Sequence, residues 1–249
     1  MANYKKNMSG AARVWKILGL LVLALMAWTG WCLIPPGKVA ETPVQGKLPA
    51  DFIWGVSSSG FQSEGGELDS NWHRLNKIRP TQDRYGSSVD FRHRYREDVA
   101  LAKDLGVNTY RIGINWARVE PKKGQFDEAE LAYYDDVIKA MKEAGIAPLI
   151  TLDHFVYPGW VDDQGAWTNP QTVNDFVAYS RVIAQRYHAD VRLWITFNEA
   201  AFFIAGDSSI RKIGFSGMRE MSRNVIAAHR QVYYVIHGLD PKAMVTSNI

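Results

Sequence analysis

The run Leu193-Trp194-Ile195-Thr196-Phe197-Asn198-Glu199 is an apolar segment of about one β-strand that ends in an amide and a carboxylate. A buried parallel strand needs continuous apolar residues, and the turn after it is more easily built from Gly, Pro, Asn or Asp than from Glu. In barrels of alternating strands and helices, the C-terminal strand ends face the active site, so Glu199 is a candidate proton donor or nucleophile. The alternative is a surface glutamate that opens the next helix.

Short apolar runs alternate with amphipathic segments on both sides of this strand. The alternation predicts parallel strands joined by helical crossovers. One helix start carries Asp127 and Glu130 in the spacing of a capping box, and Gly145 ends the same helix. Besides the run quoted above, the expected strands are 52–56, 107–116, 146–152 and 243–249, and the last expected helix runs from about 217 to 237.

Five strand-helix steps fit either an open doubly wound sheet or a closed eight-stranded barrel. The turn after the first strand decides between them. It reads Ser57-Ser58-Ser59-Gly60-Phe61-Gln62 and contains neither a Gly-x-Gly-x-x-Gly motif nor a P-loop. We therefore expect an α/β fold in which residues 50–249 form about the first five strands of an incomplete (β/α)8 TIM barrel.

The composition limits the class of partner. The 249 residues are 47% hydrophobic, which is enough for a globular core, and much of the net charge of +3 comes from Lys5, Lys6, Arg13 and Lys16. The body of the chain is nearly neutral, so no nucleic-acid partner is expected. Cys32 is the only cysteine, which excludes an internal disulfide and a cysteine-based metal site. We expect neither a metal nor a cofactor.

Residues 17–34 form an uncharged apolar segment that follows a basic tail at 1–16. As a helix it would be about 27 Å long, enough to cross a bilayer core, so we expect one N-terminal transmembrane helix. The preceding cations predict a cytoplasmic N-terminus and an extracytoplasmic barrel, with residues 35–49 as a linker. The alternative is a cleaved signal peptide and a secreted protein, although bulky Trp31 fits a cleavage site poorly.

Polar and aromatic side chains gather at or beyond the expected C-terminal strand ends. Amides, an aromatic ring, a histidine and carboxylates suit a neutral, hydroxyl-rich ligand such as a sugar better than a phosphate or a metal. Arg111, inside its strand, demands an anionic partner. The other members are Gln62, Glu64, Trp116, Glu120, Asp153, His154, Asn198 and Glu199.

Three of these residues have simpler interpretations when each is taken alone. His154 is then a hydrogen-bonded structural residue, and Trp116 belongs to the core. Glu120, before a proline and two lysines, is a solvated loop charge. Their joint arrival at one rim favours the functional interpretation.

Five motifs carry a family resemblance: FIWGVSSSGFQSEGG, HRYREDVALAKDLGVNTYRIGINWARVEP, GIAPLITLDHF, GAW and ITFNEA. In order and approximate spacing they resemble the N-terminal part of family 1 glycoside hydrolases, the β-glucosidase-like retaining enzymes. The resemblance covers about residues 50–249. It implies an O-glycosyl hydrolase that cleaves β-linked sugars in small glycosides or oligosaccharides.

The resemblance also implies roles for six residues. Glu199 is implied as the general acid and base, and Arg111 as the residue that hydrogen-bonds the nucleophile. Trp116 is implied to wall the pocket. The implied sugar-hydroxyl ligands are Gln62, His154 and Asn198.

The chain departs from the family pattern at several positions. Ala200 stands where the family usually has proline, Phe155 replaces a more common tryptophan, and Asp153 replaces an aromatic or small residue. The segment after Glu199 is short and lacks the usual glycine-rich loop. The family nucleophile is a glutamate near the end of strand seven in a Thr-Glu-Asn-Gly-like motif, and the sequence ends before it.

A retaining glycosidase needs two carboxyl groups about 5–5.5 Å apart, and the sequence supplies only Glu199 convincingly. We therefore expect the chain alone to be inactive and poorly folded, because buried unpaired backbone groups at the open strand edges would cost about 1–3 kcal/mol each. One alternative is a membrane-tethered sugar-binding or scaffold protein without turnover. Another is a transglycosylase that passes the sugar to an acceptor other than water.

Overall fold

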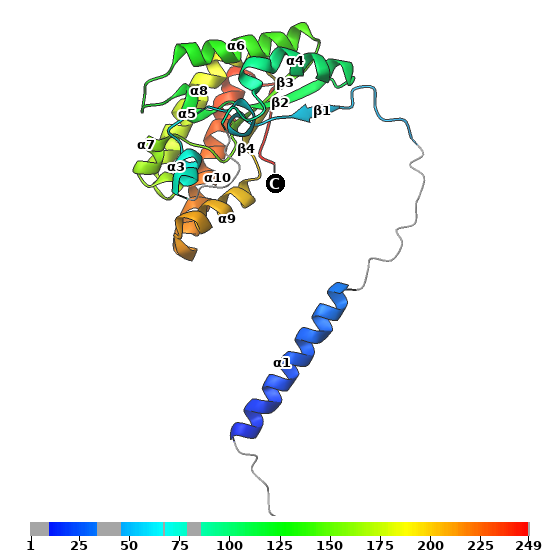
Figure 1. Cartoon of the computed structure of the whole chain (residues 1–249), viewed down its shortest axis with the longest axis vertical. Helices are drawn as coiled ribbons and strands as arrows, with labels where there is room; N and C mark the ends of the chain where they lie inside the picture. The colour runs from blue at the N-terminus through cyan, green and yellow to red at the C-terminus, as the bar shows by residue number, and fades with distance from the viewer. Residues whose placement is uncertain (1–9, 34–45, 67, 79–85, 249) are drawn as a thin grey trace, which may run out of the picture. The chain divides into compact units, whose positions relative to one another are not determined.

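The structure of the protein is a computed structural model that describes residues 10–33, 46–66, 68–78 and 86–248 (Figure 1). The chain divides into two compact units, Met1–Ala50 and Asp51–Ile249. The second unit contains all five strands and every candidate site residue.

The first unit contains one described element, the helix α1 (Gly10–Leu33). Among the helices that the structure describes, none is both long and apolar enough to cross a membrane. The transmembrane prediction for 17–34 is therefore not supported there. Residues 1–9 of the expected tail, Ile34, and residues 35–45 of the expected linker lie outside the described residues. The predicted location of the barrel outside the cytoplasm stays a prediction.

The second unit is built on one parallel sheet whose strands neighbour each other in chain order, β1-β2-β3-β4-β5. This order is the one that an unfinished barrel of strand-helix repeats requires. The register aligns Ser57 with Arg111, Arg111 with Leu149, and Leu149 with Leu193. The strands are β1 (Gly55–Ser57), β2 (Thr109–Gly113), β3 (Ala147–Asp153), β4 (Leu193–Phe197) and β5 (Met244–Thr246).

Four long helices pack against the sheet, with α4 beside α6 and α8 beside α10 (Figure 1). They are α4 (Phe91–Asp104), α6 (Glu128–Glu143), α8 (Gln171–Tyr187) and α10 (Gly214–Leu239). Their apolar faces and the sheet form one buried core that includes Val99, Met141, Phe176 and Val232. The expected crossover helices are thus confirmed, and each has buried apolar residues that join this core.

Shorter helices lie in the connections that follow the strands. The predicted loop after the first strand contains α2 (Gly60–Glu64), so Gln62 lies on a helix and not on a loop. The predicted strand 107–116 is too long, because Trp116 begins α5 (Trp116–Val119). The sequence analysis also missed α9, which starts directly after Glu199. The remaining short elements are α3 (Asn71–Ile78), α7 (Gly159–Asp163), the 3-10 helix η1 (Ala166–Thr168) and α9 (Ala200–Arg211).

The outer strands of the sheet are accessible to water. Gly55 and Ser57 of β1 and Met244 and Thr246 of β5 are exposed. Backbone groups on these edges can therefore hydrogen-bond to solvent, and the cost of burying them does not arise. The premise of buried edge groups is therefore not met, and poor folding of the chain stays a prediction.

Candidate active site

Arg111 on β2 and Asn198 at the end of β4 are joined by a hydrogen bond. Nη1 of Arg111 donates to Oδ1 of Asn198 over 3.0 Å, and Asn198 is only 2% exposed. Burial lowers the pKa of Arg111, and the nearby Glu199 carboxylate acts in the opposite direction. Because a guanidinium remains charged through such changes, the structure holds a half-buried cation next to the Asn198-Glu199 pair.

Asn248, two residues after β5, contacts both members of that pair. Its Oδ1 accepts a hydrogen bond from the backbone N–H of Glu199 at 3.1 Å. Its Nδ2 donates to Oδ1 of Asn198, also at 3.1 Å. Sequence reasoning missed Asn248 because the expected strand 243–249 included it, whereas β5 ends at Thr246 and leaves Asn248 beyond the strand end.

Glu199 is an exposed residue in the left-handed backbone region, with φ of 44°. It occupies the N-cap position of α9, but its side chain accepts no capping hydrogen bond. Glu199 therefore opens a helix, as the alternative interpretation expected, but its side chain does not cap that helix. A non-glycine residue held in this region costs about 1–3 kcal/mol, and such strain clusters at functional sites.

His154 follows β3 and is partly buried. Burial, and to a lesser degree the charge of Arg111, lowers its pKa to about 4, so the imidazole is neutral at pH 7. Its Nδ1 has no hydrogen-bond partner among the described residues. A neutral imidazole offers one donor and one acceptor, which suits a ligand hydroxyl.

The helix that carries Gln62 and the residue His154 both pack closely against Gly113 on β2. A Cβ placed on Gly113 would lie 3.1 Å from the backbone nitrogen of Gly60 and 3.9 Å from Cβ of His154. The start of α2 and His154 therefore flank the same point on β2. Gln62 itself is exposed, and its Oε1 accepts a hydrogen bond from Oγ of Ser59 at 2.6 Å.

Trp116 is completely buried and lies in the core. Its ring stacks on Tyr179 at 5.1 Å, and its Nε1 donates to Oε2 of Glu120 over 2.6 Å. No part of the ring is available to a ligand, which does not fit the predicted position in the pocket wall. Glu120 is also not the solvated loop charge that we expected, because it is 4% exposed and accepts the N–H of Gly124 at 2.7 Å.

Glu64 anchors the helix that carries Gln62. Its Oε2 accepts from Nε of Arg118 at 3.0 Å, and its Oε1 accepts from the hydroxyl of Tyr134 at 2.8 Å. Burial raises the pKa of Glu64, whereas the charge of Arg118 lowers it. The sequence predicted Glu64 at the rim of the site, whereas in the structure it is buried and holds α2 through Arg118 and Tyr134.

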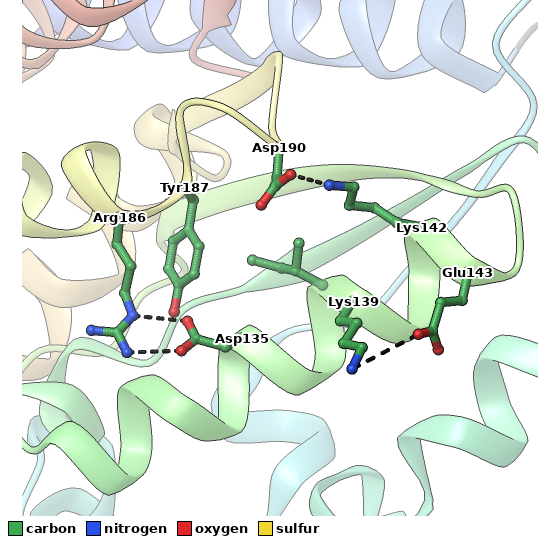
Figure 2. Close-up of a pocket in the computed structure, with 8 residues that line it drawn as sticks. Asp135, Lys139, Lys142, Glu143, Arg186, Tyr187 and Asp190 are labelled. Carbon is green, nitrogen blue, oxygen red and sulfur yellow. Dashed lines mark hydrogen bonds and ion pairs between the residues drawn. The ribbon is translucent and has the colours of Figure 1, made fainter.

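A separate pocket of about 670 Å³ lies between α6 and α8 (Figure 2). Its charges are paired: Arg186 contacts Asp135 at 2.7 Å, Lys139 contacts Glu143 at 4.0 Å, and Lys142 contacts Asp190. Because each of these charges has a partner within the pocket, the pocket presents no excess charge to a ligand. It contains none of the residues that the sequence selected.

The sheet order and the polar residues at the strand ends define the class of fold, the N-terminal part of a (β/α)8 barrel. Within the described ranges there is no group of three or more His, Cys, Asp or Glu side chains able to hold a metal ion. The family model for "Glycosyl hydrolase family 1" matches residues 44–239, and the chain belongs to this family.

Relatives and solved structures agree with this assignment. The chain is 39% identical over 170 residues to "Beta-glucosidase 40" of Arabidopsis thaliana, covering 64% of this chain and 33% of that protein. It superimposes on the solved structure of "Aphid myrosinase" with a TM-score of 0.75 and 29% identity, over 82% of this chain and 48% of that one. For "Beta-glucosidase from Thermotoga maritima in complex with castanospermine" the TM-score is 0.71 at 28% identity, covering 80% and 48%.

The matches cover only part of the relatives. The chain spans about a third of the length of the first two curated relatives, 33% in each case. The solved structures are covered over about half their length.

Proposed function

We propose that this chain provides the acid/base half of a retaining β-glycosidase site of the β-glucosidase type. The observation that carries the proposal is the Asn198-Glu199 pair at the end of β4, in which buried Asn198 is tied to Arg111 on β2 by a 3.0 Å hydrogen bond. That bond holds an amide, a cation and an exposed carboxylate together at the C-terminal ends of the strands.

In the proposed reaction, Glu199 donates a proton to the departing glycosidic oxygen and later accepts one from water. A second carboxylate attacks the anomeric carbon and forms the glycosyl intermediate. The family resemblance assigns that carboxylate to a glutamate near the end of strand seven. The half-buried guanidinium of Arg111 lies near Glu199 and is proposed to donate to that second carboxylate.

Three side chains are proposed to hold the sugar. The imidazole of His154 is neutral at pH 7 and has a free Nδ1 within the described part of the chain. Oδ1 of Asn198 is engaged by Arg111 and Asn248, which directs its Nδ2 amide hydrogens to the ligand. Gln62 is exposed on α2, the helix that follows β1, and adds an amide.

Binding is the first test, because it does not require turnover. Castanospermine is a suitable probe, since the Thermotoga maritima β-glucosidase described above was solved in complex with it. We expect titration calorimetry to detect binding to the 249-residue chain, and weaker binding to His154→Ala. Exposed Arg181→Ala is the control. If wild type and control both fail to bind, the sugar site is refuted.

The second test isolates the acid. Sodium azide is supplied as an external nucleophile together with phenyl β-D-glucoside. Azide attacks the anomeric carbon, the bond to the phenol oxygen breaks, and the proton of Glu199 goes to that oxygen, giving phenol and α-glucosyl azide. Glu199→Gln should suppress this product, while Glu220→Gln on α10, where the side chain is 41% exposed, should not. Binding without any azide product favours the non-catalytic sugar-binding alternative.

A further inference from the structure

A buried carboxyl group lies at the end of β3, directly before His154. Asp153 is 1% exposed, and its Oδ2 has no hydrogen-bond partner among the described residues. A buried polar atom without a partner destabilises the folded protein, so a carboxyl group at this position is expected to have another role. The other oxygen, Oδ1, makes a hydrogen bond that indicates this role.

Oδ1 of Asp153 accepts a hydrogen bond of 2.9 Å from the backbone N–H of Phe155. This contact from residue i to the N–H of residue i+2 closes a turn around His154. Phe155 has a φ of 70°, which is unusual for a bulky residue. The turn is therefore strained, and it persists only where its surroundings hold it.

The ring of Phe155 also fixes this turn, by packing against two other aromatic rings. It stacks against Phe203 on α9 at 5.9 Å and against Trp72 on α3 at 6.2 Å. His154 lies between the two fixed points, the Asp153 side chain on one side and the Phe155 ring on the other. Loss of the Asp153 contact removes the hydrogen bond to the peptide N–H that directly follows His154.

Asp153 also reaches the neighbouring strand. Its backbone carbonyl accepts the N–H of Asn198 at 2.9 Å. One residue thus contacts the turn that carries His154 and the strand end that carries Asn198.

We propose that Asp153 is a positioning residue for sugar recognition, whose side chain fixes the orientation of His154 through the N–H of Phe155. The proposal rests on the function proposed above, in which His154 binds a sugar hydroxyl. Asp153 itself is buried and does not touch the ligand.

The test compares variants that keep or remove the acceptor. Asp153→Asn keeps an oxygen at the Oδ1 position, whereas Asp153→Leu has a similar volume and no acceptor. Asp153→Ala is a second variant without the acceptor, in case the leucine variant does not fold. Asp240→Leu is the control, because Oδ1 of Asp240 accepts the N–H of Lys242 at 2.9 Å in the same type of turn after α10.

The first readout is the imidazole of His154 in NMR spectra, assigned among the six histidines with His154→Asn. Wild type, Asp153→Asn and Asp240→Leu should show the same His154 signals and no titration between about pH 5.5 and 8. In the variants without the acceptor, the ring should reach solvent and begin to titrate in this range. Unchanged His154 signals in both acceptor-free variants overturn the proposal.

The second readout is castanospermine affinity. We expect about tenfold weaker binding without the acceptor, rescue in Asp153→Asn, and no change in Asp240→Leu. Equal affinity in wild type and both acceptor-free variants also overturns the proposal. If wild type does not bind castanospermine, the proposed function fails, while the NMR comparison still decides whether Asp153 orients His154.

Discussion

Nη1 of Arg111 donates a 3.0 Å hydrogen bond to Oδ1 of Asn198, across 87 positions of sequence. The bond links β2 to the end of β4 and spans the intervening strand β3. It joins two residues that the sequence selected for the site, and it fixes the amide on which the proposed sugar recognition depends.

Replacing Arg111 with methionine should weaken sugar binding without unfolding the domain. The substitution removes a charged donor to Asn198 and leaves Asn248 as the remaining donor to that oxygen. Because the proposed sugar contact depends on the orientation of the Asn198 amide, castanospermine affinity should fall about tenfold when this donor is lost. Arg111 is half-buried with an unpartnered Nε, so the free energy of unfolding should change by less than about 1 kcal/mol.

Calorimetry and urea unfolding measure these two effects separately. Arg181→Met on α8 is the matched control, because Arg181 is exposed. Unchanged affinity in Arg111→Met would show that Asn198 does not need this donor.

The buried pair of Glu64 and Arg118 should dominate the stability of the segment that carries Gln62. Glu64→Gln removes the charge that Arg118 contacts at 3.0 Å, and both side chains are at most 5% exposed. Glu130 lies 3.8 Å from Arg118 and stays as a second partner, so urea unfolding should show a loss above about 1 kcal/mol but below the about 3–5 kcal/mol that an unpaired buried charge costs. The exposed pair of Glu97 and Arg94 is the control, and Glu97→Gln should cost less than about 1 kcal/mol. Equal losses in the two variants would contradict this argument.

The parallel sheet and its crossover helices were predictable because they depend on local patterns. Asp127 illustrates this at one helix: its side chain accepts the N–H groups of Ala129 and Glu130, as the predicted cap requires. The reciprocal half of the capping box was wrong, because the Glu130 carboxylate pairs with Arg92 at 2.6 Å. The competing partner is 38 residues away, and local spacing does not reveal it.

Burial was the main property that sequence alone did not predict at the site. Glu120 looked like a loop charge because its neighbours in sequence are polar. In the fold it faces Nε1 of Trp116, so the buried indole and the carboxylate satisfy each other. Asn248 was missed for a related reason, since its importance depends on contacts with Asn198 and Glu199 that only the neighbouring strand end provides.

Asp153 should make the protein less stable as the pH rises. Burial raises its pKa to about 8, with the Asp207 carboxylate adding to the effect. In the unfolded chain the carboxyl group ionises near pH 4. Between these values the folded state holds a proton that the unfolded state lacks, so stability falls by up to about 1.4 kcal/mol per pH unit. The contribution is complete below about pH 4 and lost above about pH 8.

Urea unfolding at several pH values, with wild type compared to Asp153→Asn, isolates this contribution because the other titrating groups cancel in the difference. A difference that does not vary between about pH 5 and 8 would show that Asp153 is ionised in the folded protein.

His154 should act in the opposite direction over part of the same range. Its folded-state pKa is about 4, below the ordinary value of about 6.5. Between these values the unfolded state binds a proton that the folded state lacks, so stability rises with pH by at most about 1.4 kcal/mol per unit. Its contribution is present above about pH 6.5 and is lost as the pH falls towards 4.

The two neighbouring residues should therefore nearly cancel between about pH 4 and 6.5, and only the Asp153 effect should remain between about pH 6.5 and 8. His154→Asn removes one of the opposing effects. Relative to wild type, this variant should gain stability as the pH falls below about 6.5, whereas Asp153→Asn should gain stability as the pH rises. The double variant should lose both dependences. A His154→Asn difference that is flat from about pH 4.5 to 6.5 would mean that the imidazole is as accessible to protons in the folded protein as in the unfolded chain.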